Sequence, residues 1–461
     1  MKSKTQKWSD KRDDRTDRID GVKSTYKDSN LRIILPDVNA HRYNEQVMLL
    51  TTANICARWA NNIDFQIPEG CPAVLKRFAK RSLKDIVHEI VLLANPDCHL
   101  TFNTERRSDQ ISLSIGNAVV DSDIWIASDG WVAAYGCKRE CEISQNPRQS
   151  VVGSAFAACL GASELFRIAN GEDSTEMRRC FSLYNYRSSE NIDDLLNPDF
   201  GAGKFDAGLV HQIGCGAIGS SFGFFLSLTE DMSADLHLID DDHIEPPNTS
   251  SSLIFTKAQT DNVTYKVDAV DAYLKGTLIN SVPHVEEYAQ FINNGKYNRF
   301  VPDLILCFAN DKGIWSTIQN KFPPLTFHAT TNKSWGTNFG RHIPEKEWCI
   351  MCRFHGEIQA KFTSVVCSAG NISPEPEKEI LGILPFLAPA SALIALTEIY
   401  KLNTDPNYSD GPSFVEFSMR KATGGFVGSL RGAKQCYVCR DQSLDLYPKY
   451  IQDTKYWRLT A

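Results

Sequence analysis

The run Gly214-Cys-Gly-Ala-Ile-Gly219 constrains the fold of this 461-residue chain more than any other feature. It follows an apolar stretch, 209–213, with the pattern of a buried strand, and precedes segment 220–228, which has the composition of a helix. A strand, a glycine turn and a helix in this order form the context that a dinucleotide-type phosphate loop requires. Glycines let backbone N–H groups approach a phosphate, and the positive end of the helix favours its charge. We therefore expect an α/β unit, Rossmann-like, with a largely parallel sheet.

Acidic and basic residues after the next strands indicate which nucleotide is bound. The strand 236–239 ends at Asp240, an acid that can hold ribose hydroxyls, and up to this point an NAD-dependent dehydrogenase fits equally well. Lys266, and Asp311 after the strand 304–308, suit a triphosphate and Mg²⁺ better than a nicotinamide. Taken singly, Lys266 could be solvated and Asp311 could cap a loop. Together, after the glycine turn, they predict an ATP site.

Two pairs of cysteines have the spacing of zinc ligands. Cys349 and Cys352 form one CxxC pair, and Cys436 and Cys439 form the other. Four thiolates suit tetrahedral structural Zn²⁺, which would tie the C-terminal tail to the domain. A redox function would need only one pair in a thioredoxin-like context.

Cys367 belongs to neither pair. It stands 15 residues after Cys352, and Gly370, Pro374 and Pro376 follow it, so we expect a loop. A lone cysteine is usually a packing residue, but a thiolate on a loop at this position can attack an acyl-adenylate. Cys367 is therefore the candidate nucleophile.

The N-terminal half predicts a second unit without a glycine turn. Residues 1–30 are polar with mixed charges, which is typical of a flexible extension or an edge helix. The expected helices are 42–63, 72–93 and 153–168, and the expected strands are 111–115 and 124–127.

Glu164-Leu-Phe-Arg-Ile168 is similar to Glu398-Ile-Tyr-Lys-Leu402, and each ends a helix rich in Ala and Ser. This similarity hints that two halves share one architecture. We divide the chain into an extension (1–30), a first domain (31–200), a second domain (201–445) and a tail (446–461).

These residues together resemble the ubiquitin-activating-enzyme-like family, which includes the ThiF, MoeB and HesA enzymes. The resemblance covers most of 204–441 and rests on Gly214, Gly216, Ala217, Ile218, Gly219, Asp240, Asp242, Asn248, Lys266, Asp311, both CxxC pairs and the Cys367-Ser-Ala-Gly segment. It implies that the first ten of these residues bind ATP and Mg²⁺, that Lys266 and Asp311 are catalytic, and that Cys367 carries the carrier protein's C-terminus as a thioester. It also implies that the first domain is a degenerate, inactive adenylation domain that packs against the active one.

Arginines that contact ATP in the family are missing at two positions. Arg42-Tyr-Asn-Glu-Gln46 resembles the RYxRQ segment that precedes the family's adenylation domains, but Glu45 replaces its second arginine. Ser251 stands where the family has an arginine three residues after Asn248. Arg42, Lys257 or another cation would have to substitute. The acid after the third strand also comes one residue late, at Asp311.

The implied partners are a ubiquitin-like (β-grasp) protein and a conjugating enzyme. The compact layout most resembles activating enzymes of bacterial ubiquitin-like conjugation operons, some of which act in phage defence. Two alternatives stay open: a sulfur-carrier-protein adenylyltransferase or sulfurtransferase, and a scaffold with a dead nucleotide site. A homodimer and a self-sufficient duplicated chain are both compatible with the sequence.

Net charge and hydropathy indicate where in the cell the protein is located and which classes of partner are excluded. The formal net charge of −7 argues against a nucleic-acid binder. The N-terminal residues MKSKTQKWSD lack the apolar region of a secretory signal. The uncharged stretch from Ile380 to about Leu396 contains Pro385 and Pro389 and is short for a bilayer, so we expect a buried loop and helix. A cytoplasmic protein without membrane contact follows.

Overall fold

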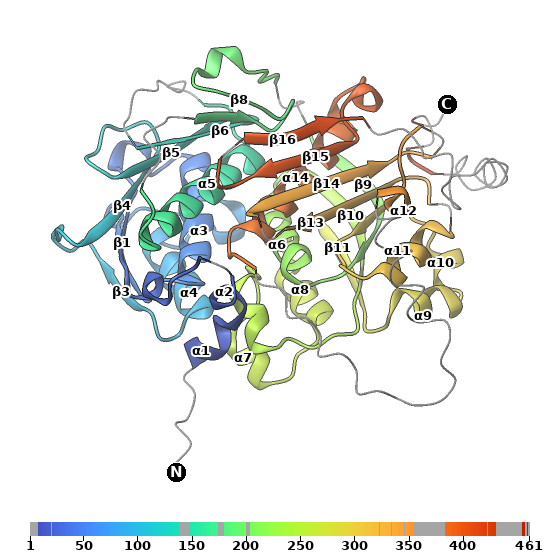
Figure 1. Cartoon of the computed structure of the whole chain (residues 1–461), viewed down its shortest axis with the longest axis horizontal. Helices are drawn as coiled ribbons and strands as arrows, with labels where there is room; N and C mark the ends of the chain where they lie inside the picture. Colours follow the sequence, from blue (N-terminus) through green and yellow to red (C-terminus); the bar gives the residue numbers. More distant parts are fainter. Residues whose placement is uncertain are drawn as a thin grey trace, which may run out of the picture.

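The computed structural model shows two α/β units joined along one chain (Figure 1). It describes residues 8–19, 21–137, 147–173, 179–199, 203–321, 323–332, 334–344, 346–353, 383–421, 423–429, 454–456 and 459. Each unit is built on an eight-stranded sheet. The expected fold class, α/β with two mostly parallel Rossmann-like sheets, is confirmed.

The first sheet has the order β3-β2-β1-β4-β5-β6-β7-β8. Its strands are β1 (Asn30–Ile34), β2 (Asn62–Gln66), β3 (His99–Phe102), β4 (Gln110–Ile115), β5 (Ile124–Asp129), β6 (Val132–Gly136), β7 (Arg179–Ser182) and β8 (Arg187–Ser189). Strands β1 to β5 run parallel, and the pairs from β5 to β8 are antiparallel. The helices of this unit are α3 (Tyr43–Ala57), α4 (Leu83–Ala94) and α5 (Val151–Ala169), with the 3₁₀ turns η1 (Ser24–Asp28), η2 (Asp37–Asn39), η3 (Lys76–Phe78) and η4 (Ile192–Asp194).

The second sheet has the order β11-β10-β9-β12-β13-β14-β15-β16. Its strands are β9 (Phe205–Ile213), β10 (Met232–Ile239), β11 (Ile279–His284), β12 (Leu304–Cys307), β13 (Thr326–Thr331), β14 (Gly336–His342), β15 (Phe414–Ser418) and β16 (Thr423–Gly428). Its helices are α6 (Ala217–Leu226), α7 (Lys257–Asp261), α8 (Lys266–Leu274), α9 (Tyr288–Asn293), α10 (Lys296–Arg299), α11 (Lys312–Gln319), α12 (Ile350–Arg353) and α14 (Leu387–Thr404), with η5 (Pro246–Ser250) and η6 (Tyr408–Asp410). Again the first five strands are parallel and the last three antiparallel.

The two units repeat one topology strand for strand, so β1 corresponds to β9 and β8 to β16. In both, a long helix follows the sixth strand: α5 in the first unit and α14 in the second. The two similar sequence segments lie on these two helices. Glu164 pairs with Arg167 on α5, with Oε2 and Nη1 2.9 Å apart, and Glu398 pairs with Lys401 on α14. A pair of a glutamate and a cation three residues later, on the corresponding helix of each unit, supports an internal duplication.

One hydrophobic core runs through both units. Phe417 of β15 packs against Phe156 and Phe181 of the first unit, with ring centroids 5.2 and 4.4 Å away. Buried Arg58 ends α3 and donates hydrogen bonds to backbone oxygens of the second unit, including that of Thr249 at 2.9 Å. Burial lowers the pKa of Arg58 to about 9. Apolar burial of this extent makes the units one cooperative body.

Helix α5 is long and apolar enough to cross a membrane by length and composition, with a mean hydropathy of 1.4 over an 18-residue window. Of that window, 94% is buried inside the fold, where α5 packs against α3 and α14. Helix α14 is also buried, as expected for the uncharged stretch near Leu396.

Several predicted bounds were wrong. The helix expected at 42–63 ends at Ala57, because β2 begins at Asn62 and pairs with β1. The helix expected at 72–93 begins only at Leu83, where the Ser82 hydroxyl accepts the N–H of Asp85 as an N-cap. Residues 8–19, placed in a flexible extension or edge helix, form α1 (Trp8–Arg12) and α2 (Asp14–Asp17) and contact η5 of the second unit.

Candidate nucleotide site

The glycine turn has the local geometry that a phosphate loop needs. Gly214 follows β9 with φ of +93°, and a Cβ there would lie 2.7 Å from the Ala309 nitrogen. A Cβ on Gly219 would lie 2.2 Å from the Gly214 oxygen, so this glycine lets α6 pack closely on the turn. At Gly216, by contrast, a Cβ meets no atom of the described residues within 4 Å. The turn is therefore closed by packing at two glycines and open at the third.

Helix α6 begins at the open glycine. Gly216 is its N-cap, and Ala217 and Ile218 are its first two residues. Ile218 is buried in the core, which fixes the first turn of the helix. The unpaired N–H groups of this turn and the helix dipole favour an anion beside Gly216.

Asp240 connects the end of β10 to this turn. Because β9 and β10 are parallel, Asp240 and Gly214 lie at the same edge of the sheet. Its Oδ2 accepts the N–H of Cys215 at 2.7 Å and its Oδ1 accepts that of Asp242 at 2.9 Å. Burial raises the pKa of Asp240, and Lys266 opposes that shift.

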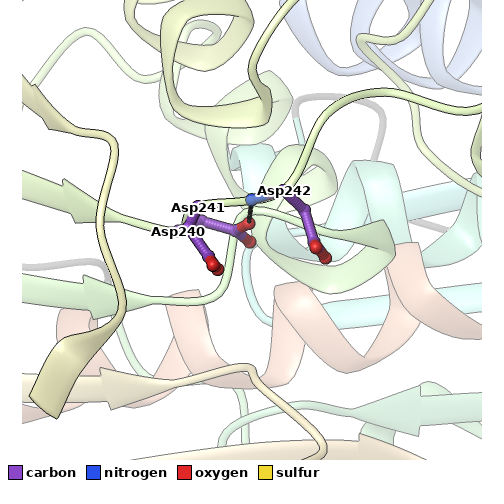
Figure 2. A group of neighbouring side chains, drawn as sticks. All are labelled: Asp240, Asp241 and Asp242. Atoms are coloured by element: carbon purple, nitrogen blue, oxygen red, sulfur yellow. Dashed lines mark hydrogen bonds between the residues drawn. The ribbon is translucent and has the colours of Figure 1, made fainter.

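Three consecutive carboxylates, Asp240, Asp241 and Asp242, gather at this edge (Figure 2). One carboxylate oxygen from each lies within 4.8 Å of the others, and the side chains of Asp241 and Asp242 are exposed. Hard divalent cations such as Mg²⁺ prefer oxygen ligands of this kind. The donor set fits a magnesium ion.

Lys266 is held against these carboxylates. It is the first residue of α8 and is buried, and its backbone N–H donates to the Asp242 oxygen at 3.0 Å. Its Nζ lies 2.5 Å from Asp242 Oδ2. Lys266 and Asp242, predicted to belong to one site, are thus brought together.

Asp311 and Asn248 are engaged in local capping. Asp311 is the exposed N-cap of α11, and its Oδ1 accepts the N–H groups of Gly313 and Ile314 at 2.7 and 3.1 Å. It follows β12, which runs parallel to β9, so it lies at the same sheet edge without belonging to the group of three carboxylates. Asn248 in η5 accepts the N–H of Glu245 at 2.8 Å. If Asp311 or Asn248 also contacts ATP or Mg²⁺, it does so with a side chain that already caps a helical turn.

Arg15 lies near the carboxylates of this sheet edge, and the sequence analysis did not single it out. It lies on α2, and its Nε is buried without a hydrogen-bond acceptor among the described residues. Burial lowers the pKa of Arg15, whereas the nearby carboxylates of Glu245, Asp14 and Asp242 oppose that shift. The Thr16 hydroxyl donates to the Ile383 oxygen at 3.2 Å, which anchors α2 on the second unit. In the sequence Arg15 is one of several charges in a mixed run, so only tertiary packing distinguishes it.

The positions that depart from the family pattern lie elsewhere. The segment Arg42–Gln46 follows β1 and begins α3, so it does not precede the unit as the resemblance implied. Glu45 is buried there with a raised pKa, and its Oε1 lies 3.8 Å from Arg42 Nη1. Lys257 pairs with Asp261, with Nζ and Oδ2 2.6 Å apart. Ser251 is buried.

The described CxxC pair has the spacing of two zinc ligands. Cys349 and Cys352 are buried at α12, with their Sγ atoms 3.6 Å apart. Two thiolates on a tetrahedral Zn²⁺ at about 2.3 Å would be separated by roughly 3.8 Å. Cys436, Cys439 and Cys367 lie outside the described residues, so the four-cysteine site and the nucleophile stay predictions.

Comparison with known proteins finds one family model and several distant solved structures. In crystal structures of E. coli MccB, the complex with ATP is 17% identical with a TM-score of 0.35, and the similarity covers 50% of this chain and 66% of MccB. The complex with MccA-N7isoASN is 15% identical with a TM-score of 0.35, covering 69% and 97%. No curated protein matches the chain. Residues 30–184 match the family model of the BilD N-terminal domain, so the first unit, from β1 to β7, is similar to that domain.

Proposed function

We propose that the second unit binds Mg·ATP and adenylates the C-terminal carboxylate of a ubiquitin-like protein. The observation that carries this proposal is the open turn at Gly216 beside a lysine, Lys266, already paired with a carboxylate at the same sheet edge. A nicotinamide cofactor has no group that requires this lysine and three adjacent carboxylates. A nucleoside triphosphate with its cation uses all of them.

Each group of residues has its own role in binding Mg·ATP. Backbone N–H groups at Gly216 and the first turn of α6 receive phosphate oxygens. Lys266 exchanges its contact with Asp242 for the phosphates and draws negative charge from them. Asp242, from the group of three carboxylates, and Asp311, the N-cap of α11, would hold Mg²⁺, which neutralises charge and orients the α-phosphate. Asp240 would hold the ribose hydroxyls.

The reaction transfers an adenylyl group. A carboxylate oxygen of the carrier protein bonds to the α-phosphorus, and the bond from that phosphorus to the bridging oxygen of the β-phosphate breaks. Pyrophosphate leaves with the electron pair of the broken bond. Holding the two reactants in line lowers the barrier because it removes the entropic cost of their encounter.

Arg15 would take over the role of the arginines missing from the family pattern. A buried Nε–H without a hydrogen-bond acceptor among the described residues is costly to the free protein. Phosphate oxygens would satisfy it and neutralise its charge at once. The N-terminal segment thus completes a site otherwise built by the second unit.

The second step forms a thioester on Cys367. Its thiolate attacks the carbonyl carbon of the acyl-adenylate, and AMP leaves. Zinc bound by Cys349, Cys352, Cys436 and Cys439 would anchor the segments on both sides of this residue. Transfer to a conjugating enzyme, as in bacterial ubiquitin-like operons of phage defence, rests on the compact layout of the chain.

ATP–pyrophosphate exchange in the presence of a purified β-grasp protein tests the adenylation step. Asp311→Asn keeps a good helix N-cap, so we expect unchanged thermal unfolding with loss of exchange. Cys367→Ala should exchange normally but lose the thiol-sensitive adduct. Exchange at the wild-type level in Asp311→Asn would refute the role of Asp311. If calorimetry detected no ATP binding, only the alternative of a scaffold with a dead nucleotide site would remain.

A further inference from the structure

A cavity of about 500 Å³ lies between the two units, away from the glycine turn. Its walls include residues of η3 and α4 of the first unit and the segments before β9, β10 and β11 of the second. Those strands are parallel, so the cavity lies at the edge where they begin, whereas the glycine turn and Asp240 lie where they end. Nine residues of β9 at about 3.3 Å each separate the two edges by roughly 30 Å.

Cations dominate the lining of this cavity, which we call the basic cavity. Its five cations are Lys76, Arg77, Arg81, Lys204 and Lys275, against the carboxylates of Glu89 and Glu230. The chain as a whole carries a net charge of −7, so this excess of positive charge is local. Charge of one sign gathered in a cavity raises the local concentration of opposite ions.

Both carboxylates are already paired. Glu230 holds Lys76, with Oε2 2.8 Å from Nζ, and its Oε1 accepts the Lys76 backbone N–H at 2.9 Å. Glu89 pairs with Arg81. These two pairs neutralise four of the seven charges and leave Arg77, Lys204 and Lys275.

The three remaining cations come from three separate segments. The guanidinium of Arg77 lies 4.3 Å from the ring centroid of Tyr273, a contact that uses its face rather than its N–H donors. Lys204 is exposed directly before β9. Lys275 has one loose contact, 3.7 Å from Nζ to Asp271 Oδ2. Convergence of such groups on one cavity is an arrangement that suits an anion.

We propose that the basic cavity binds a small phosphorylated molecule at a second site, independent of the nucleotide site. A volume of about 500 Å³ is in the range of small-molecule pockets. An arginine stacked against a tyrosine and two exposed lysines match a ligand with at least two phosphate groups better than a single carboxylate. The occupant contacts both units and therefore stabilises their association.

Calorimetric titration of the full chain with inorganic tripolyphosphate tests this site, using two variants. Arg77→Glu combined with Lys204→Glu should weaken binding at least about tenfold, because two attractions become repulsions. Lys266→Ala should keep the binding, because it removes a cation only from the nucleotide site. ADP and an octaglutamate peptide are added as second and third probes. Binding of ADP to Lys266→Ala with the same dependence on Arg77 would identify a nucleotide as the occupant.

Other outcomes would overturn the proposal. Tripolyphosphate binding that is lost in Lys266→Ala and kept in the double variant would place the anion at the nucleotide site. Binding of octaglutamate alone would point to an acidic protein segment instead. The double variant should retain ATP–pyrophosphate exchange, so failure of this proposal is distinguishable from failure of the adenylation proposal.

Discussion

Lys266 lies 2.5 Å from Asp242, measured from Nζ to Oδ2, at the sheet edge where β10 ends. The lysine is buried and the aspartate side chain is mostly exposed, so one partner is fixed by packing while the other faces solvent. An exposed ion pair contributes little to stability. We infer that the pair positions Lys266 for a phosphate.

Lys266→Ala should reduce the ATP–pyrophosphate exchange rate by about 10²- to 10³-fold, the usual effect of removing one charged donor from a transition state. The fold should persist, as judged by the circular dichroism spectrum. Lys421→Ala, at an exposed position in the turn between β15 and β16, is the matched control and should exchange normally. Equal rates in the two variants would exclude a role for Lys266 in the reaction.

Two glycines of the turn should respond differently to alanine. Gly219→Ala places a Cβ 2.2 Å from the Gly214 oxygen, so the free energy of unfolding should fall by about 1–3 kcal/mol. Gly216→Ala meets no described atom within 4 Å, so stability should change little while ATP binding weakens. Urea unfolding and calorimetry with ATP measure the two effects. Tight ATP binding by Gly216→Ala would show that the phosphates do not approach this residue.

Arg15→Ala should raise the KM for ATP about tenfold, because a charge-assisted hydrogen bond to phosphate is lost. Initial rates of exchange over a range of ATP concentrations provide the measurement. Arg18→Ala is the control, since Arg18 is exposed and bonded to Asp14. If both variants had the wild-type KM, the N-terminal segment would have no part in ATP binding.

Buried histidines should make the protein less stable in mild acid. His211 of β9 and His284 of β11 lie on either side of His237. Burial, together with neighbouring His237, lowers the pKa of His211 to about 3 and that of His284 to about 4. An unfolded histidine has a pKa near 6.5, so below that pH the unfolded chain binds more protons. The free energy of unfolding should therefore fall as pH drops from about 6.5 towards 4.

Urea unfolding at pH 7 and pH 5 measures this dependence. His211→Phe should remove up to about 1.4 kcal/mol per pH unit from the slope, because it deletes one titrating group that is fully buried. His88→Gln, at an exposed position of α4, should leave the slope unchanged. A slope that is the same in His211→Phe and in the wild type would mean that His211 is not the titrating group.

Local patterns predicted the strand, the glycine turn and the helix correctly, because these elements are neighbours in the sequence. The strand, the glycine turn and α6 follow one another within about 20 residues, so alternation, glycine and apolar content suffice to indicate them. The similar segments at Glu164 and Glu398 likewise sit on helices that correspond between the units. Helix ends were less predictable: α3 ends at Ala57, and the side chain of Arg58, its C-cap, bonds to residues of the second unit nearly 200 positions away.

The sequence by itself determined the α/β class and the glycine turn between a strand and a helix, because each depends on short-range periodicity and residue chemistry. Only the tertiary structure decided that Arg15 lies beside Glu245 and Asp242, and that Arg77 and Lys204 share one cavity. These pairs are separated by more than 100 residues, and packing of the duplicated units through one core brings them together. Such contacts depend on the burial of apolar surface distributed over the whole chain, which no local pattern records.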